Sequence, residues 1–291
     1  MVIARSGSAR TAAWWPQTAA LVLGTAALGA ALLLPYTFSD PNGVDPYVAR
    51  ISGVALLLLA VAYARRPLVA TRPVLLALGA VTVSFTLLAA TPQILADAFG
   101  DSAPSFDAQI FWASLAQFAA TLTFVVVAWR ATAPSLSPLL RLGRLGWMAI
   151  AVSVAASVLL LLVTLALPAS LLGRLALQPV ALTRDLPWLW PANALQALAQ
   201  ELQFRGLLMG ALERVMSRRW ANLAQACFFG FSHLAVNYQG PVAPFVPVTI
   251  AVGLVLGWMV QRTQSLWPAV IVHAVADILI TIAVLPGLYG Y

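Results

Sequence analysis

Apolar stretches long enough to cross a bilayer recur along most of this chain, and they restrict its fold more than any other feature. A spanning helix needs about 20 predominantly apolar residues, and only helices and closed barrels satisfy every backbone polar group within lipid. Hydrophobic residues make up 62% of the 291 residues, whereas charged residues make up only 9%. This composition excludes an ordinary soluble domain, and we predict an all-α, polytopic transmembrane helix bundle.

Nine stretches qualify as candidate spans. The second and the last four are shorter than the others or are interrupted by polar residues, so their boundaries are the least sharply defined. The nine run from Thr18 to Tyr36, Val48 to Tyr63, Pro73 to Thr91, Ala108 to Trp129, Trp147 to Leu167, Pro191 to Leu212, Trp220 to Asn237, Pro244 to Gln261 and Leu266 to Leu285.

The charges of the connecting loops predict the orientation. All sixteen basic residues are arginines, and with a cytoplasmic N-terminus twelve of them fall in the inside segments. The outside segments then carry Arg50, Arg174 and Arg184, with Asp40, Asp45, Asp97, Asp101, Asp107 and Asp185. Because cytoplasmic loops carry an excess of positive charge, we predict nine spans with the N-terminus inside and the C-terminus outside.

The same arginines account for the net charge of +7 without a nucleic-acid partner, and we expect none. The absence of lysine and the richness in Ala and Leu are typical of high-GC bacterial genes, so we expect an integral protein of a bacterial inner membrane. The single cysteine, Cys227, excludes an intrachain disulfide and a cysteine-based metal cluster.

A stretch that contains three prolines, from Pro168 to Trp190, separates two parts of the chain. Residues 1–170 hold about five of the predicted spans and have little polar content within them. Residues 190–285 hold about four spans and contain every ionisable residue that lies in the middle of one. We therefore interpret the first part as a transmembrane scaffold and the second as the part that carries the function.

Five ionisable residues lie inside predicted spans of the second part. They are Glu201, Arg205, His233, His273 and Asp277. A charged group at the bilayer centre costs roughly 2.5–3.5 kcal/mol even on the lenient insertion scale, and the chain has only two histidines and two glutamates in all. Their placement on three separate predicted helices predicts a functional site.

The spacing of these residues predicts which of them interact. Glu201 and Arg205 are four residues apart, so they lie on one helical face within reach of an ion pair. His273 and Asp277 have the same spacing, which suits either a hydrogen-bonded orienting pair or two ligands of one metal. The pattern Gly253-x-x-x-Gly257, like Gly206-x-x-x-Gly210, permits close helix packing.

One carboxylate and two imidazoles that converge from three spans are the groups needed to activate water. A His-Glu-x-x-His pattern is absent from the sequence, so an ordinary zinc peptidase is not indicated. Ser232 and His233 are neighbours in sequence and point about 100° apart on a helix, so we expect no Ser–His dyad between them.

Three motifs in order resemble those of a known family. Gln200-Glu201-x-x-Phe204-Arg205-Gly206, Phe229-x-x-x-His233 and His273-x-x-x-Asp277 are similar to the Glu-Glu-x-x-x-Arg, Phe-x-x-x-His and His-x-x-x-Asn/Asp motifs of the CPBP intramembrane proteases. This group, also called the Abi family, comprises CAAX proteases and bacteriocin-processing proteins and includes the type II CAAX prenyl endopeptidases. The resemblance covers roughly residues 190–285, as a CPBP-like catalytic core.

The resemblance implies a role for each matching residue. His233 would help to activate the attacking water, and His273 with Asp277 would polarise the scissile carbonyl or hold its oxyanion. Glu201 would pair with Arg205. Gln200 occupies the position of the first motif glutamate, the family's general base, and a neutral amide cannot take a proton from water. Either Glu201 takes the base role, the site is a modified one, or the protein does not cleave peptides.

The function that the resemblance implies is an intramembrane endopeptidase. Its partners would be the lipid bilayer and a membrane protein or peptide substrate, including CAAX-like ones. The family is often labelled metalloendopeptidase, which makes a divalent metal such as zinc conceivable, with His233, His273 and Asp277 as its ligands; the sequence leaves the metal open. A catalytically inactive protein of the same fold with an immunity or scaffold role is the alternative, and a transporter ranks third.

Overall fold

The computed structural model describes residues 46–132, 143, 146–166, 186–233 and 246–289. Within these ranges all regular secondary structure is helical, and no strand occurs. The predicted all-α class is therefore confirmed for the described part of the chain. The first predicted span, Thr18 to Tyr36, lies outside the described residues.

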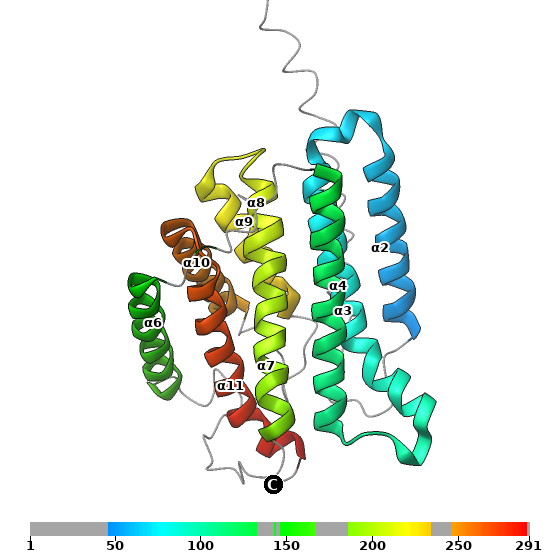
Figure 1. Ribbon diagram of the computed structural model, residues 1–291, viewed down its shortest axis with the longest axis vertical. Coiled ribbons are helices and arrows are strands. Elements are labelled where there is room, and N and C mark those ends of the chain that lie inside the picture. The colour runs from blue at the N-terminus through cyan, green and yellow to red at the C-terminus, as the bar shows by residue number, and fades with distance from the viewer. Residues whose placement is uncertain (1–45, 133–142, 144–145, 167–185, 234–245, 290–291) are drawn as a thin grey trace, which may run out of the picture.

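The N-terminal part of the described chain contains three long helices. These are α2 (Pro46–Ala64), α3 (Arg72–Phe99) and α4 (Phe106–Thr132), with the short turns η1 (Arg66–Thr71) and η2 (Gly100–Ser102) between them. α3 lies between α2 and α4 and contacts both (Figure 1). Gly100 follows α3 with a φ of 51°, a left-handed conformation that glycine adopts without steric cost and that ends the helix before the turn to α4.

The C-terminal part begins with α6 (Trp147–Ala166) and continues through a long central helix. That central helix consists of α7 (Leu186–Glu201), the π-helical segment η3 (Leu202–Leu208) and α8 (Met209–Leu212), which follow one another without a break. At about 1.5 Å per residue it is long enough to cross a bilayer. α9 (Arg218–Ser232), α10 (Val246–Thr263) and α11 (Trp267–Tyr289) complete the bundle.

Three of the described helices are long and apolar enough to span a membrane by themselves. They comprise Arg72–Ser102, Asp107–Val127 and Val246–Thr263. Gly53–Ala64, Trp147–Leu162 and Trp267–Leu279 are apolar but shorter. The membrane character predicted from the sequence is thus confirmed, while the count of nine spans stays a prediction.

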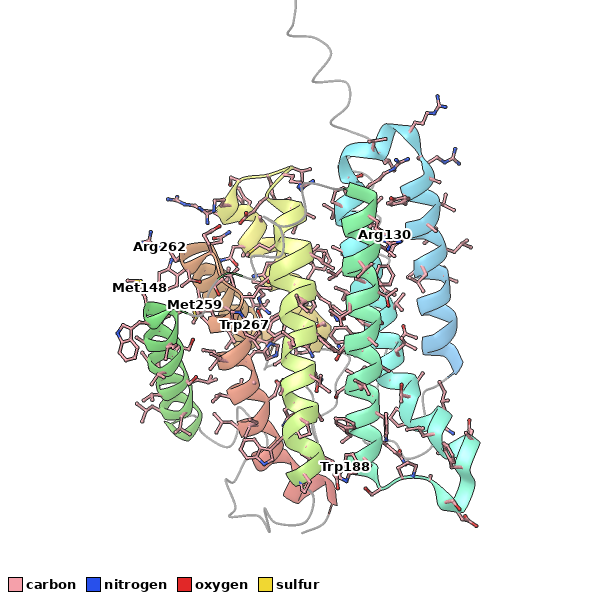
Figure 2. All side chains as sticks on the ribbon, in the orientation of Figure 1. Arg130, Met148, Trp188, Met259, Arg262 and Trp267 are labelled. Atoms are coloured by element: carbon pink, nitrogen blue, oxygen red, sulfur yellow. The ribbon has the colours of Figure 1, made fainter. Side chains whose placement is uncertain are left out.

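The ends of the bundle differ in charge. α4 ends near Arg130 and α10 near Arg262, and both arginines lie toward the upper end in Figure 2, whereas Trp188 lies at the lower end. α3 ends and α4 begins at that lower end (Figure 1), where Asp101 and Asp107 stand in the first turns of η2 and α4. This separation matches the predicted alternation of loop charges; the direction of insertion stays a prediction.

The central helix is surrounded by other helices. η3 contacts α3, α4, α9 and α10, and every residue from 199 to 212 is buried. Phe204 and Leu208 are fully buried within the hydrophobic core. A helix that is enclosed on all sides can hold polar side chains away from lipid, so this segment is the place in the fold where a charged site is best sheltered.

α9 and α10 pack closely where α10 presents Gly253 and Gly257. A Cβ atom on Gly253 would lie 3.2 Å from Ala226 of α9, and one on Gly257 would overlap the Oδ1 atom of Asn222. On the other side of the contact, a Cβ atom on Gly230 would lie 3.1 Å from the backbone nitrogen of Ile250. The small residues therefore let the two helix backbones approach, as the Gly-x-x-x-Gly pattern predicted.

We expect Gly257→Ala to destabilise the protein by about 1–3 kcal/mol, because the added methyl group would displace the Asn222 and Gln225 side-chain amides from their buried hydrogen bonds. Gly53→Ala is the matched control, since Gly53 lies in α2 with nothing within 4 Å of an added Cβ; there alanine should be neutral or stabilise by up to about 1 kcal/mol. Thermal unfolding in detergent, followed by tryptophan fluorescence, measures both. Equal melting temperatures of the two variants would contradict the tight contact.

Candidate active site

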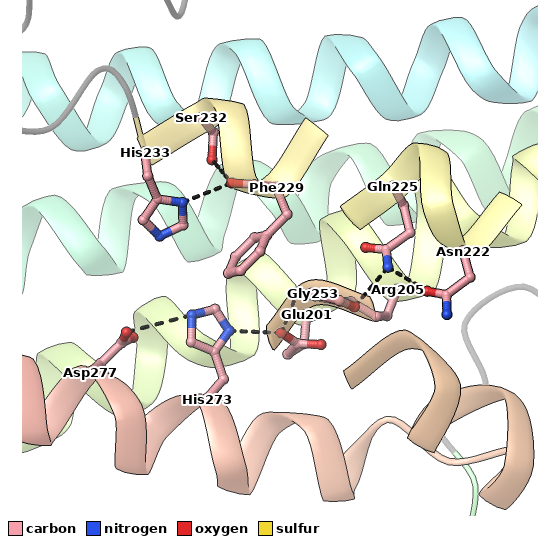
Figure 3. Close-up of polar contacts among 10 residues, drawn as sticks. All are labelled: Glu201, Arg205, Asn222, Gln225, Phe229, Ser232, His233, Gly253, His273 and Asp277. Carbon is pink, nitrogen blue, oxygen red and sulfur yellow. Dashed lines mark hydrogen bonds and ion pairs between the residues drawn. The ribbon is translucent and has the colours of Figure 1, made fainter. Parts of the chain in front are cut away.

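The predicted site residues come from three elements that meet beside the central helix. Glu201 is the last residue of α7, His233 directly follows α9, and His273 and Asp277 lie on α11. Figure 3 shows Glu201 and Asp277 on either side of His273, with His233 across the ring of Phe229. The sequence-based expectation that three separate helices converge here agrees with this arrangement.

One oxygen of Glu201 accepts two hydrogen bonds. Arg205 Nη1 donates to Glu201 Oε1 at 2.6 Å, and His273 Nδ1 lies 2.7 Å from the same oxygen. A carboxylate oxygen can only accept, so His273 Nδ1 carries the hydrogen. The side chains of Glu201 and Arg205 are fully buried. The ion pair predicted from the i, i+4 spacing is therefore present, and it extends to His273.

The other oxygen of Glu201 has a different environment. Glu201 Oε2 is buried and makes no hydrogen bond within the described part of the protein. Asp277 Oδ2 is likewise buried and makes no hydrogen bond within the described part of the protein. Each of these two atoms is an acceptor that the surrounding side chains leave available within the site.

A π-helical turn begins directly after Glu201. η3 covers Leu202–Leu208 and contains Arg205, while Glu201 directly precedes it. Single π-helical turns inside α-helices are rare and are frequent at functional sites. No local sequence pattern predicts this turn, because its residues are those of an ordinary buried helix segment.

His273 bridges two carboxylates. Its Nδ1 atom contacts Glu201, and its Nε2 atom lies 3.5 Å from Asp277 Oδ1. The second distance is long for a hydrogen bond, and the contact is an ion pair when His273 is protonated. Of the two roles that the spacing of His273 and Asp277 left open, the orienting pair is the one that these contacts favour.

His233 is oriented by the end of α9. Its Nδ1 atom lies 2.7 Å from the Phe229 carbonyl oxygen and donates to it, and Ser232 Oγ donates to the same oxygen at 2.7 Å. The backbone N–H of His233 turns to the carbonyls of Gly230 and Phe231, which leaves the Phe229 carbonyl to these side chains. In the neutral imidazole the lone pair is then on Nε2. Ser232 and His233 both bind Phe229, in agreement with the absence of a dyad.

The ring of Phe229 stands at the centre of the site. Its centroid lies 4.8 Å from that of His233 and 5.3 Å from that of His273, both edge-on, and Arg205 Cζ lies 4.2 Å from it. A cation over an aromatic face is attracted by the ring's quadrupole. Phe229 therefore holds both histidines and Arg205 in place through one side chain.

The donor atoms do not fit a three-ligand metal site. Within the described residues no three His, Cys, Asp or Glu side chains are grouped to hold a metal ion. His273 Nδ1 donates to Glu201, and His233 Nδ1 donates to the Phe229 carbonyl. These contacts orient both rings and are compatible with a metal at Nε2, but His233, His273 and Asp277 are not grouped as three ligands of one ion.

Two polar residues of the site were missed in the sequence. Gln225 Nε2 donates to the Gly253 carbonyl at 3.0 Å and to Asn222 Oδ1 at 2.7 Å, and Arg205 Nη2 donates to the same carbonyl at 3.4 Å. Asn222 and Gln225 are buried amides spaced i, i+3 within a predicted span. That pairing is a sequence signal for an interhelical contact, although neither side chain is ionisable.

Gln200 is buried beside Glu201 at the end of α7, with 6% of its surface exposed. It therefore lies within the enclosed part of the central helix, where the first motif glutamate would be. The nearby Gln203 side chain is directed toward α4, where its Nε2 atom donates to Thr121 Oγ1 at 2.7 Å. That contact joins the N-terminal helices to the central helix.

Comparison with known proteins yields one family. Residues 182–279 match the family described as type II CAAX prenyl endopeptidase Rce1-like. The matched range runs from the start of α7 into α11 and contains Glu201, Arg205, His233, His273 and Asp277. No curated protein and no solved structure matches the chain.

Proposed function

We propose that this chain, whose residues 182–279 match the family described as type II CAAX prenyl endopeptidase Rce1-like, is an intramembrane endopeptidase. It would hydrolyse peptide bonds of membrane-associated proteins, with CAAX-like C-termini as one substrate class. The observation that carries the proposal is the buried Glu201–His273 contact at 2.7 Å, with His233 across the Phe229 ring. Family membership alone supports a protease; the site geometry supports the roles below.

Glu201 and His233 are the proposed activators of water. Glu201 Oε2 makes no hydrogen bond within the described protein, and His233 carries its lone pair on Nε2 when Nδ1 donates to Phe229. Glu201 Oε2 takes a proton as the water oxygen attacks the carbonyl carbon, and His233 Nε2 accepts a hydrogen bond from the same water. The C–N bond then breaks, and the same proton passes to the leaving amine. This assignment gives the base role to Glu201, since Gln200 cannot accept a proton.

His273 and Asp277 are the proposed partners of the substrate carbonyl. Glu201 fixes the His273 ring through Nδ1, so its Nε2 edge faces Asp277. When His273 is protonated on both ring nitrogens, Nε2 is a donor held in this way and can stabilise the oxyanion that develops as water adds to the carbonyl. Arg205 compensates the buried charge of Glu201, because either charge alone would be unmatched in the protein interior.

We assign the two parts of the chain different tasks. Residues 190–285 form the catalytic core, and residues 1–170 form a transmembrane scaffold that supports it. The contacts of α3 and α4 with η3 and the Gln203–Thr121 hydrogen bond favour this division. The proposed location is a bacterial inner membrane, with the N-terminus inside.

The proposal is tested with purified protein in liposomes and an internally quenched, farnesylated peptide that ends in a CAAX sequence. An unprenylated peptide of the same sequence reports whether the lipid group is required. We expect cleavage by the wild type and none by His233→Ala. If the wild type cleaves neither of the two peptides and no protein in a mixture of intact membrane proteins, the endopeptidase assignment is wrong.

A non-catalytic membrane protein of the same fold, with an immunity or scaffold role, is the second candidate. It is favoured by Gln200, which replaces a basic carboxylate with an amide at a buried position. Under this candidate the wild type cleaves nothing, Gln200→Glu gains cleavage of the same peptides, and His233→Ala leaves the cellular function intact. Cleavage by the wild type would exclude it.

A further inference from the structure

We propose that Asn222 and Gln225 are positioning residues for the reaction, because they fix the stretch of α10 that holds Arg205 and, through Arg205, Glu201. We call the two residues the amide clamp. The inference rests on the proposed function and adds to it two residues that lie outside all three motifs.

The clamp joins α9 to two consecutive carbonyls of α10. Asn222 Nδ2 donates to the Leu254 carbonyl at 3.0 Å, and Gln225 Nε2 donates to the Gly253 carbonyl at 3.0 Å. Gln225 Nε2 also donates to Asn222 Oδ1 at 2.7 Å, so the two side chains hold each other. Figure 3 shows the Gln225 amide nitrogen between the Gly253 carbonyl and the Asn222 amide oxygen. The register of α9 against α10 is set by these bonds.

Two glycines of α10 make the space for the clamp. A Cβ atom on Gly257 would overlap Asn222 Oδ1 and lie 2.6 Å from Gln225 Nε2. A Cβ atom on Gly253 would lie 3.2 Å from Phe229 Cδ1. The two amides therefore occupy space that a side chain at position 257 would fill. This space lies next to the Phe229 ring, which contacts Arg205.

Arg205 depends on the clamp for two of its contacts. Its guanidinium group is fully buried, and Nη1 donates to Glu201 while Nη2 donates to the Gly253 carbonyl at 3.4 Å. Its third contact is the Phe229 ring, 4.2 Å from Cζ. Gln225 binds the same Gly253 carbonyl more closely, at 3.0 Å, and Phe229 lies one helical turn after Gln225. The clamp thus holds the carbonyl directly, and the ring lies on the same helix one turn further along.

The same face of α9 carries the clamp and the catalytic histidine. Asn222, Gln225, Phe229 and His233 follow at spacings of three, four and four residues, which places them along one side of a helix. A change in the register of α9 would displace Phe229 and His233 together. It would also shift Arg205 away from the Glu201 oxygen that His273 shares. The clamp can therefore set the geometry of both proposed water-activating groups.

The catalytic part is tested with Gln225→Met, which keeps the length of the side chain and removes its donors. We expect kcat to fall about tenfold with KM within about twofold, since a tenfold loss corresponds to about 1.4 kcal/mol and the clamp lies behind Arg205. Gln225→Glu should lower kcat further than Gln225→Met does, because a carboxylate beside the Gly253 carbonyl competes with Glu201 for Arg205.

Thr121→Val is the matched control. It removes another buried interhelical hydrogen bond, from Gln203 Nε2 to Thr121 Oγ1 at 2.7 Å, which belongs to none of the contacts of Arg205 or Phe229. It should lower the melting temperature to a similar extent and leave kcat within about twofold. If Gln225→Met behaves as Thr121→Val does, with full kcat in an active protein, the proposal is overturned.

A thermal double-mutant cycle tests the clamp even if the protein cleaves no peptide. Gln225→Met is measured in the wild type and in Arg205→Lys, which keeps the charge and lacks the guanidinium fork that reaches two acceptors. We expect Gln225→Met to lower the melting temperature less in the Arg205→Lys background than in the wild type. The difference between the two falls should be roughly 2–4 °C, which corresponds to about 1 kcal/mol of coupling. Equal falls in both backgrounds would mean that the clamp only joins two helices, and would overturn the proposal.

Discussion

The variant Glu201→Gln should lose peptide cleavage and much of its stability at the same time. Glu201 is the proposed base, and an amide cannot accept the proton. It is also the partner of a fully buried Arg205 at 2.6 Å, and removal of one partner of a buried ion pair costs about 3–5 kcal/mol because the other charge is left uncompensated. We expect no cleavage above the level of an empty liposome, together with a lower melting temperature.

The double variant Glu201→Gln/Arg205→Met separates these two effects. Replacement of both partners of a buried pair by neutral groups is often neutral or stabilising, so most of the lost melting temperature should return. Activity should not return, because the base is still absent. Cleavage at the wild-type rate by Glu201→Gln, or a double variant as unstable as the single one, would contradict the assigned roles of this pair.

His233→Gln should lower kcat by about 10²–10⁴-fold, the range typical for removal of a general acid–base group. The loss of stability should be small by comparison. His233 lies at the end of α9, is only partly buried, and makes a hydrogen bond to the Phe229 carbonyl that a glutamine amide can replace. The measurement is kcat with the farnesylated quenched peptide, together with thermal unfolding of the same preparation.

Ser232→Ala is the control for His233. Ser232 Oγ donates to the same Phe229 carbonyl at the same distance of 2.7 Å, so its removal disturbs the end of α9 in a similar way without removing an imidazole. We expect its kcat to stay within about threefold of the wild type. Equal losses in Ser232→Ala and His233→Gln would assign the effect to the helix end and would exclude His233 as an activator of water.

The general architecture could be predicted from sequence because the bilayer leaves few alternatives. Apolar length alone identified the helices from Pro73 to Thr91 and from Ala108 to Trp129, which the structure extends to Arg72–Phe99 and Phe106–Thr132. The Glu201–Arg205 pair followed from an i, i+4 spacing within apolar surroundings, where each charge requires a partner. Both predictions rest on local rules that do not require knowledge of tertiary contacts.

The details of the site depended on tertiary contacts and could not be read in advance. The contact between His273 and Glu201 joins residues 72 positions apart, and no local pattern specifies that the two meet through Nδ1. The π-helical turn at Leu202–Leu208 is enclosed by four other helices, and its local sequence resembles an ordinary helix. Phe229 is part of the second motif, yet its shared contact with two histidines and Arg205 depends on how the helices pack around it.

Asn222 and Gln225 illustrate a different limit. Both are visible in the sequence as polar residues within a predicted span, and the i, i+3 spacing places them on one face. Their partners are backbone carbonyls of Gly253 and Leu254, which carry no sequence signal of their own. A buried amide in a span requires a partner within the protein, as an ionisable residue does, and it therefore also indicates an interhelical contact.

The central claim is that this membrane protein cleaves other membrane proteins with His233 in the site. The most direct measurement compares the N-termini of membrane proteins from cells that produce the wild type with those from cells that produce His233→Ala, at equal abundance of both folded proteins. We predict new N-termini that occur only with the wild type, and their sequences would identify a substrate. Identical sets of N-termini in the two cell types would contradict proteolysis and would support the non-catalytic candidate.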